Sequence, residues 1–185
     1  MLQNIYDKVG LCEKMSYFDF QYDSNGDPLI SNCQTVDFYK YYTTANSIVA
    51  FEALYRNKQS IQEKFLAYWD KVSARFGTNP FVVGFDPLNE PFPGNFLRNP
   101  KLLEPGHADQ INLAPMYAAI QEKFMANSNE TSKMWFEPNV FPDEIGVPIG
   151  EGDLGGKVFP VGFQTPPGGA IGSPNHVLND HTYCC

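Results

Sequence analysis

Residues 81–92 read FVVGFDPLNEPF, a short apolar run that ends on a carboxylate and a proline. The apolar run between turn residues predicts a buried strand over residues 81–85, of the kind found in parallel sheets. Pro91 has no N–H to donate, so ladder pairing ends directly after Glu90. Strands of an α/β barrel deliver catalytic side chains at their carboxyl ends. Asn89 and Glu90 are therefore candidates for a catalytic site, although a strand-to-loop junction with a merely solvated Glu90 fits the spacing equally well.

The clearest helix lies upstream of this strand, over residues 61–76. Ser60 and Glu63 form the pattern of a capping box, in which each side chain bonds a free backbone N–H of the other residue. Gly77 is the expected C-terminal stop. Apolar residues at helical spacing form a stripe that predicts core packing rather than a ligand site: Ile61, Phe65, Tyr68, Trp69, Val72 and Phe76. Residues 36–57 are aromatic-rich and are predicted to be helical in their second half.

Downstream, the sequence predicts a helix over residues 113–125 and a short strand over 134–136 that ends in Glu137. Residues 139–176 carry many glycines and prolines, which predicts an irregular loop. The order of helices and strands favours βαβ units and a parallel sheet.

The last predicted strand covers residues 177–183. Because side chains alternate along a strand, His181 and Tyr183 are expected on the same side. If the predicted strands are parallel and adjacent, the polar residues at their ends share one rim. Adjacent strand residues point to opposite faces, so Asn89 and Glu90 both reach that rim only if the chain is irregular there.

The length and composition of the 185 residues argue against several classes of protein and site. The length is enough for one core and does not require a second domain, and no run of 18 apolar residues is present. A formal net charge of −8 argues against a nucleic-acid groove, which needs a basic stripe, and agrees with a neutral substrate such as carbohydrate. Four cysteines are too few for a disulfide scaffold, and no Cys/His spacing resembles a zinc site, so no metal or cofactor is expected.

The rim carries the residue types that glycoside hydrolysis requires. The leaving oxygen of a sugar needs a proton donor, and the oxocarbenium-like carbon needs a second carboxylate. Glu90 is the candidate donor, and Asn89 is suited to hold a sugar hydroxyl. His181 alone is more often a hydrogen-bonded core residue, but its pairing with Tyr183 favours a functional role.

Residues 84–92 resemble the strand-four motif of family 5 glycoside hydrolases, which are retaining (β/α)8-barrel glycosidases. The resemblance implies that Glu90 is the catalytic acid/base and that Asn89 binds the 2-hydroxyl of the sugar. His181-Thr182-Tyr183 resembles the family's His-x-Tyr pair after strand six. That resemblance implies that His181 and Tyr183 orient the nucleophile and the bound sugar.

Residues 33–57, with the tract NSIVAFEALY, are similar to endoglycoceramidases and related glucosylceramidase-like enzymes, as are residues 61–69 and the C-terminal DHTYCC. The similarity implies retaining hydrolysis of the β-bond between glycan and ceramide, with a glycolipid or oligosaccharide as substrate. It also implies the fold: an α/β protein of the TIM-barrel type, with residues 1–185 as one partial (β/α)8 barrel that holds roughly strands four to six and their flanking helices.

The chain departs from the family pattern at the nucleophile. The family's nucleophilic Glu ends strand seven and would lie beyond Cys185, so a fragment that is inactive by itself is expected. Glu137 precedes the His-x-Tyr pair and fits strand five. It is interpreted as a rim or structural carboxylate and as a candidate for substrate contact.

Two other functions stay open: a β-glucan or glucosylceramide hydrolase of the same family, and a non-catalytic truncated remnant. The loop with Phe159, Phe163 and Pro166 offers an apolar wall for peripheral contact with lipid, or is merely surface. No signal peptide is visible in residues 1–10. The expected location is extracellular or lysosome-like if the full gene supplies a signal peptide, and cytoplasmic otherwise.

Overall fold

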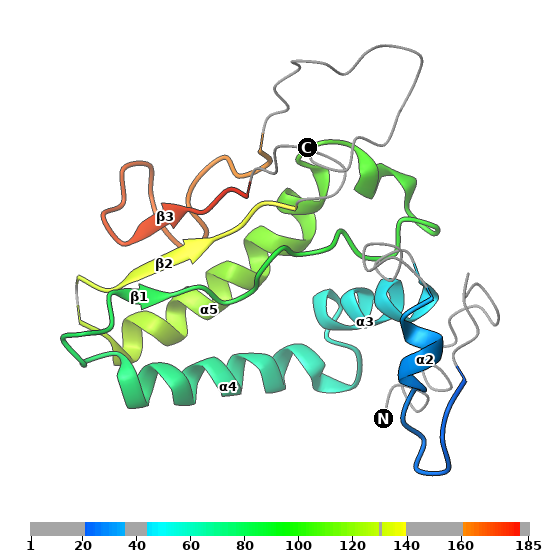
Figure 1. Cartoon of the computed structure of the whole chain (residues 1–185). Helices are drawn as coiled ribbons and strands as arrows, with labels where there is room; N and C mark the ends of the chain where they lie inside the picture. Colours follow the sequence, from blue (N-terminus) through cyan, green and yellow to red (C-terminus); the bar gives the residue numbers. More distant parts are fainter. Residues whose placement is uncertain (1–20, 36–43, 130, 140–160, 182–185) are drawn as a thin grey trace.

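The computed structural model describes residues 21–35, 44–129, 131–139 and 161–181 (Figure 1). Its helices and strands are α2 Ile30–Cys33, α3 Ala45–Tyr55, α4 Ile61–Phe76, β1 Gly84–Phe85, α5 Ala114–Asn127, β2 Lys133–Phe136 and β3 His176–Leu178. Short 3-10 turns cover Lys58–Ser60 and Pro100–Leu103. A π-helical segment, Asp109–Leu113, leads into α5.

The three strands form one parallel sheet in the order β1-β2-β3. In its register Phe85 lies beside Met134, and Phe136 lies beside Leu178. Figure 1 shows all three strands pointing the same way, with α4 and α5 running next to one another along the sheet. The predicted parallel sheet is confirmed, and the residues that follow each strand lie at one edge.

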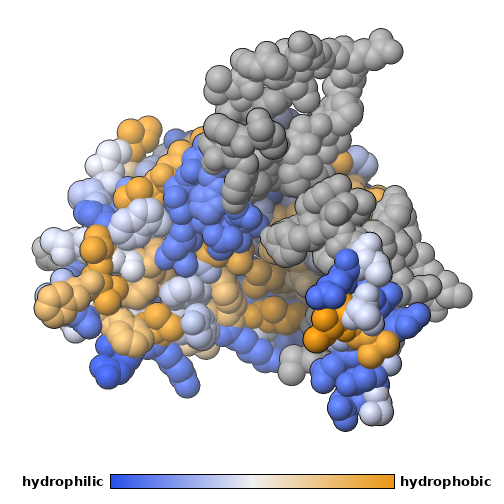
Figure 2. Space-filling model, viewed as in Figure 1, coloured by the Kyte–Doolittle hydropathy of each residue, from blue (hydrophilic) through white to orange (hydrophobic). Residues whose placement is uncertain are grey.

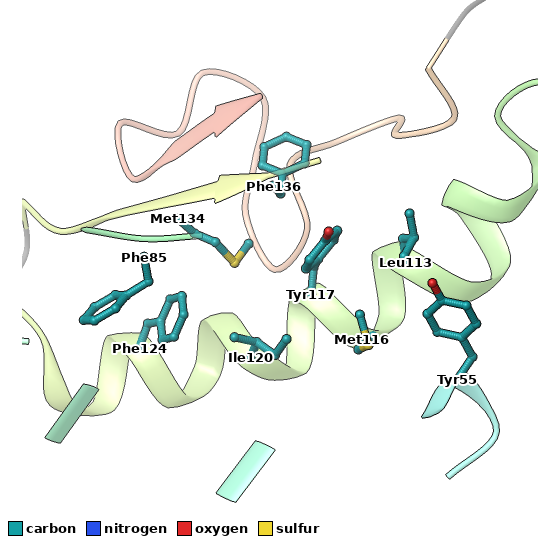
Figure 3. Packing of buried hydrophobic residues seen from close by; sticks show 9 residues of the cluster. All are labelled: Tyr55, Phe85, Leu113, Met116, Tyr117, Ile120, Phe124, Met134 and Phe136. Carbon is teal, nitrogen blue, oxygen red and sulfur yellow. The ribbon is translucent and has the colours of Figure 1, made fainter. Parts of the chain in front are cut away.

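The core lies between the sheet and α5 (Figure 3). In β2, Met134 and Phe136 are buried and the alternate residues Lys133 and Trp135 are only half-buried, so one face of the strand meets the helix. Each fully buried side chain of this size contributes about 1.5–3 kcal/mol relative to an exposed one. The buried cluster consists of Tyr55, Phe85, Leu113, Met116, Tyr117, Ile120, Phe124, Met134 and Phe136.

Helix α4 has the bounds that the sequence predicts, and Phe65, Trp69 and Val72 pack against the core. Trp69 meets Phe124 edge to face, with ring centroids 5.6 Å apart. The predicted stripe is wider than the buried face, because Tyr68 and Phe76 are 57% and 42% exposed.

The start of α4 differs from the predicted capping box. Ser60 has a left-handed backbone, with φ of 58°, and its side chain makes no cap hydrogen bond. Asn57 takes the reciprocal role instead: its side chain accepts from the Glu63 N–H at 3.2 Å and donates to the Glu63 carboxylate at 2.8 Å. Gly77 does end the helix, but with a right-handed φ of −63°. A Cβ there would lie 2.5 Å from the Ser128 hydroxyl, so close packing is what requires glycine.

Two strands are shorter than the sequence predicts. The expected strand over residues 81–85 is paired only at Gly84–Phe85, because Asn79 forms a turn that takes up the N–H groups of Phe81 and Val82. Phe81 is consequently 92% exposed rather than buried. The expected strand over 177–183 is His176–Leu178, and Tyr183 lies outside the described residues.

The surface is mixed in polarity. Figure 2 shows apolar side chains exposed at the end of the molecule where β1 begins, and Phe81 and Val83 belong to that end. In the described part of the chain, no helix has both the length and the apolar character needed to cross a bilayer.

Gly84 tests the contact between β1 and β2. A Cβ at this position would collide with the Lys133 carbonyl and lie 2.5 Å from the Trp135 ring. We expect Gly84→Ala to lower the free energy of unfolding by about 1–3 kcal/mol, as overpacking does. The neighbouring control Val83→Ala, at a 64% exposed position, should stay within about 0.5 kcal/mol of the native chain. Urea unfolding followed by tryptophan fluorescence measures both, and equal stabilities for the two variants would contradict this close contact.

Candidate active site

Polar side chains from the segments after all three strands meet at the carboxyl edge of the sheet. Asp86 and Glu90 follow β1, Glu137 follows β2, and Asn179 and His181 follow β3. The parallel register causes this convergence, because the strand ends lie side by side. The structure thus brings together three of the five residues that the sequence singles out: Glu90, Glu137 and His181.

His181 bridges two carboxylates. Its Nδ1 lies 2.9 Å from Glu90 Oε1, and its Nε2 lies 3.2 Å from Glu137 Oε1. A protonated imidazole donates at both contacts, and a neutral one donates at only one. The imidazole therefore couples the proton positions of two acids that come from different strands.

Glu137 is the buried member of the pair, with a side chain that is only 1% exposed. Its Oε2 accepts the backbone N–H of Glu90 at 2.5 Å, and its Oε1 accepts the amide of Asn179 at 3.1 Å. The pKa of Glu137 is raised to about 7, chiefly by burial and also by the nearby Asp86 carboxylate. The Glu90 N–H and His181 oppose the rise in this pKa.

Glu90 is more open to solvent, with a side chain that is 21% exposed. Its backbone is left-handed, with φ of 45°. A non-glycine residue in this region costs about 1–3 kcal/mol, so the surroundings must hold it there. Asn89 and Glu90 can both reach the carboxyl edge of the sheet only if the chain is irregular there, and this left-handed backbone is such an irregularity. The Asn89 side chain is exposed.

The loop around Glu90 is fastened to the core by its carbonyl groups. The Tyr55 hydroxyl donates to the Phe92 carbonyl at 2.6 Å, and the Asn112 amide donates to the Pro93 carbonyl at 2.8 Å. The Tyr117 hydroxyl lies 3.4 Å from the Leu88 carbonyl. Side chains of the helical layer therefore hold the loop on both sides of Glu90.

Asp109 fixes the chain that follows Glu137. Its buried carboxylate accepts the backbone N–H of Asn139 at 2.7 Å and that of Gly162 at 2.8 Å. Burial raises the pKa of Asp109, and these two hydrogen bonds oppose the rise. The sequence gives no local signal for this role, because the two partners lie 30 and 53 residues away.

Two polar residues of the site are absent from the sequence-based prediction. Asn179 donates to Asp86 Oδ2 at 2.9 Å as well as to Glu137. The alternation that places His181 and Tyr183 on one side of a strand places Asn179 on that side too, so Asn179 could have been predicted as a site residue. Asp86 follows β1 directly and is likewise visible as a strand-end carboxylate. Among the described residues, no group of three or more His, Cys, Asp or Glu side chains is arranged to hold a metal ion.

The protonation of Glu137 can be tested through stability. Glu137→Gln removes the titration of this carboxyl, whose pKa lies near 7 in the folded chain and near 4.5 ordinarily. As pH rises between these values, the unfolded chain ionises while the folded chain keeps its proton, so the native chain should lose stability relative to the variant. Each unit of difference in pKa corresponds to about 1.4 kcal/mol. Urea unfolding from pH 4.5 upward measures this; a native chain that gains on the variant as pH rises would contradict the raised pKa.

Comparison with known proteins gives a consistent likeness. Over 158 residues the chain is 32% identical to the endoglycoceramidase of Hydra vulgaris and 30% identical to that of Cyanea nozakii. The match covers 85% of this chain and 28% of each relative, so the chain spans less than a third of their length. No protein-family model matches the sequence.

The fold is similar to endo-glycoceramidase II from Rhodococcus sp. in its complex with a cellobiose-like isofagomine. The TM-score is 0.61 at 18% identity, over 92% of this chain and 32% of that chain. This likeness agrees with a part of a TIM barrel, and the assignment of β1, β2 and β3 to barrel strands four to six stays a prediction. Over most of its length, this chain is homologous to one part of the endoglycoceramidases.

Proposed function

We propose that this chain is the part of a retaining endoglycoceramidase-type glycosidase that carries the acid/base, and that Glu90 is that acid/base. The observation that supports this most strongly is the place of Glu90. It lies at the carboxyl edge of a parallel sheet, partly exposed, in contact with His181 and with its backbone held by a buried carboxylate. A group that must meet substrate in a fixed orientation requires this combination of access and rigidity.

In the first step, protonated Glu90 gives its proton to the glycosidic oxygen while a second carboxylate attacks the anomeric carbon. The carbon–oxygen bond breaks, and the lipid leaves as an alcohol. In the second step, the Glu90 carboxylate takes a proton from water, and the oxygen of that water displaces the enzyme carboxylate from the sugar. Glu90 ends protonated, as it began, and the anomeric configuration is retained.

Glu137 is poorly suited to be the attacking carboxylate. Its side chain is 1% exposed, and both of its oxygens accept hydrogen bonds from within the chain. We place the nucleophile outside these 185 residues, in keeping with the 28% share of the relatives that the chain covers. Asn89 is proposed to hold the 2-hydroxyl of the sugar, and His181 and Tyr183 are proposed to orient the nucleophile and the sugar.

The relatives support a glycosphingolipid substrate. The two curated relatives are endoglycoceramidases, and endo-glycoceramidase II from Rhodococcus sp. has been solved with ganglioside GM3 and as a lactosyl-enzyme intermediate. We therefore propose the β-bond between glycan and ceramide as the bond that is cleaved. Peripheral contact with the lipid surface follows from such a substrate.

Replacing Glu90 tests its role. In the complete gene product, Glu90→Gln keeps the shape of the side chain but removes the transferable proton. We expect kcat/KM for lactosylceramide to fall by about 100- to 10,000-fold, the usual contribution of general acid–base catalysis. Glu122→Gln, on an exposed position of α5, is the matched control and should leave the rate unchanged. Native-like hydrolysis by Glu90→Gln would remove Glu90 from this role.

The substrate class is tested separately, with the same complete gene product. We expect intact lactose and ceramide from lactosylceramide, and little release of sugar from a soluble β-glucan, because only the first substrate carries the lipid. Mass spectrometry of both products measures the outcome. Rapid cleavage of the glucan with lactosylceramide untouched would favour a β-glucanase, and no cleavage of either would favour a non-catalytic protein.

A further inference from the structure

Glu137 is a buried carboxyl group that the proposed reaction does not use. Burying a carboxyl group is costly unless hydrogen bonds compensate it, and here they come from three different residues. Glu90 donates its backbone N–H to Oε2, while Asn179 donates to Oε1 and His181 Nε2 lies within reach of the same oxygen. Two of these three partners, Glu90 and His181, belong to the proposed catalytic machinery.

Glu137 reaches Glu90 by two routes. The direct route is the 2.5 Å hydrogen bond from the Glu90 N–H, which fixes the backbone where φ is 45°. The second route passes through His181, whose Nε2 faces Glu137 and whose Nδ1 faces the Glu90 carboxyl at 2.9 Å. One carboxylate therefore constrains both the main chain and the side chain of the same residue.

The second route also concerns the proton of Glu90. When a neutral His181 donates its Nε2–H to Glu137, its Nδ1 is left as an acceptor. A protonated Glu90 can then donate to Nδ1, so its carboxyl group is held in one orientation while it carries the proton. Glu137 thus favours the tautomer that is compatible with an acidic Glu90, as the orienting group of a hydrolytic triad does for its histidine.

We infer that Glu137 is a positioning residue that holds Glu90 and His181 in the geometry needed for proton transfer, an inference that rests on the proposed role of Glu90 as the acid/base. When Glu137 is ionised, above its pKa of about 7, it offers acceptors on both sides. In a glutamine, one of the two oxygens becomes an amide group that donates. That group must then face either the Glu90 N–H or the pair formed by Asn179 and His181, which places donor against donor.

The experiment compares two substrates that differ in their need for an acid. Lactosylceramide has a poor leaving group and requires protonation, whereas 2,4-dinitrophenyl β-lactoside releases a stable phenolate without it. At a pH just above 7, where native Glu137 is largely ionised, we expect Glu137→Gln in the complete gene product to lower kcat/KM for lactosylceramide by about 100-fold, the usual effect of a small misplacement of a reacting group. The kcat/KM for the dinitrophenyl substrate, which reports the first step, should stay within about threefold of the native enzyme.

Three further variants complete the design. Glu90→Gln should show the same split between substrates with a larger loss, and Asn179→Ala, which removes one donor to Glu137, should show it with a smaller loss. Glu122→Gln is the exposed control and should show none. Unfolding midpoints of all variants establish that each is folded at the assay temperature, and Asn179→Ala carries the test if Glu137→Gln is not.

The outcomes separate this inference from the proposed function. If Glu90→Gln shows the split but Glu137→Gln and Asn179→Ala retain native rates on both substrates, the positioning role is overturned and the role of Glu90 stands. Equal losses on both substrates in Glu137→Gln would also overturn it, because they indicate a general loss of binding or of the nucleophile. If Glu90→Gln itself shows no split, the proposed function fails, whatever Glu137→Gln shows.

Discussion

The site depends on the hydrogen bond between the backbone N–H of Glu90 and the buried carboxyl of Glu137. This bond joins the loop after β1 to the end of β2. It holds Glu90 in a left-handed backbone conformation that residues other than glycine rarely adopt. Because the pKa of Glu137 is raised to about 7, chiefly by burial, this carboxyl group gains or loses its proton near neutral pH. The geometry around Glu90 is therefore maintained by a group whose own charge is sensitive to the environment.

The hydrophobic core also holds the loop that carries Glu90. Tyr55 and Tyr117 belong to the apolar cluster beneath the sheet, yet their hydroxyls reach carbonyl groups on either side of Glu90. Tyrosine suits this position because its ring packs like an apolar residue and its hydroxyl satisfies a polar group. The packing of α5 on the sheet, which gives the fold its stability, thereby also sets the position of the loop that carries the proposed acid/base.

Much of this arrangement can be predicted from the sequence, and the exceptions have physical causes. Helix α4 follows from helical periodicity, β2 follows from a short apolar run before Glu137 and Pro138, and the parallel sheet follows from the order of elements. The predicted capping box at Ser60 is wrong, because the left-handed backbone at Asn57 and Ser60 places Asn57 beside Glu63 instead. Residue types alone do not reveal this backbone geometry. The bridge from His181 to two carboxylates depends on the register between strands 40 or more residues apart. The role of Asp109 depends on contacts with backbone that lies 30 and 53 residues away.

The roles of Glu90 and Glu137 are tested most directly by a crystal structure of the complete gene product with an isofagomine-type sugar mimic bound. We predict that a carboxyl oxygen of Glu90 lies within hydrogen-bond distance of the mimic, on the side from which the glycosidic oxygen of a substrate would leave. We also predict that Glu137 makes no contact with the sugar and keeps its bonds to the Glu90 N–H and Asn179. A mimic bound directly by Glu137, with Glu90 turned away from it, would contradict both roles.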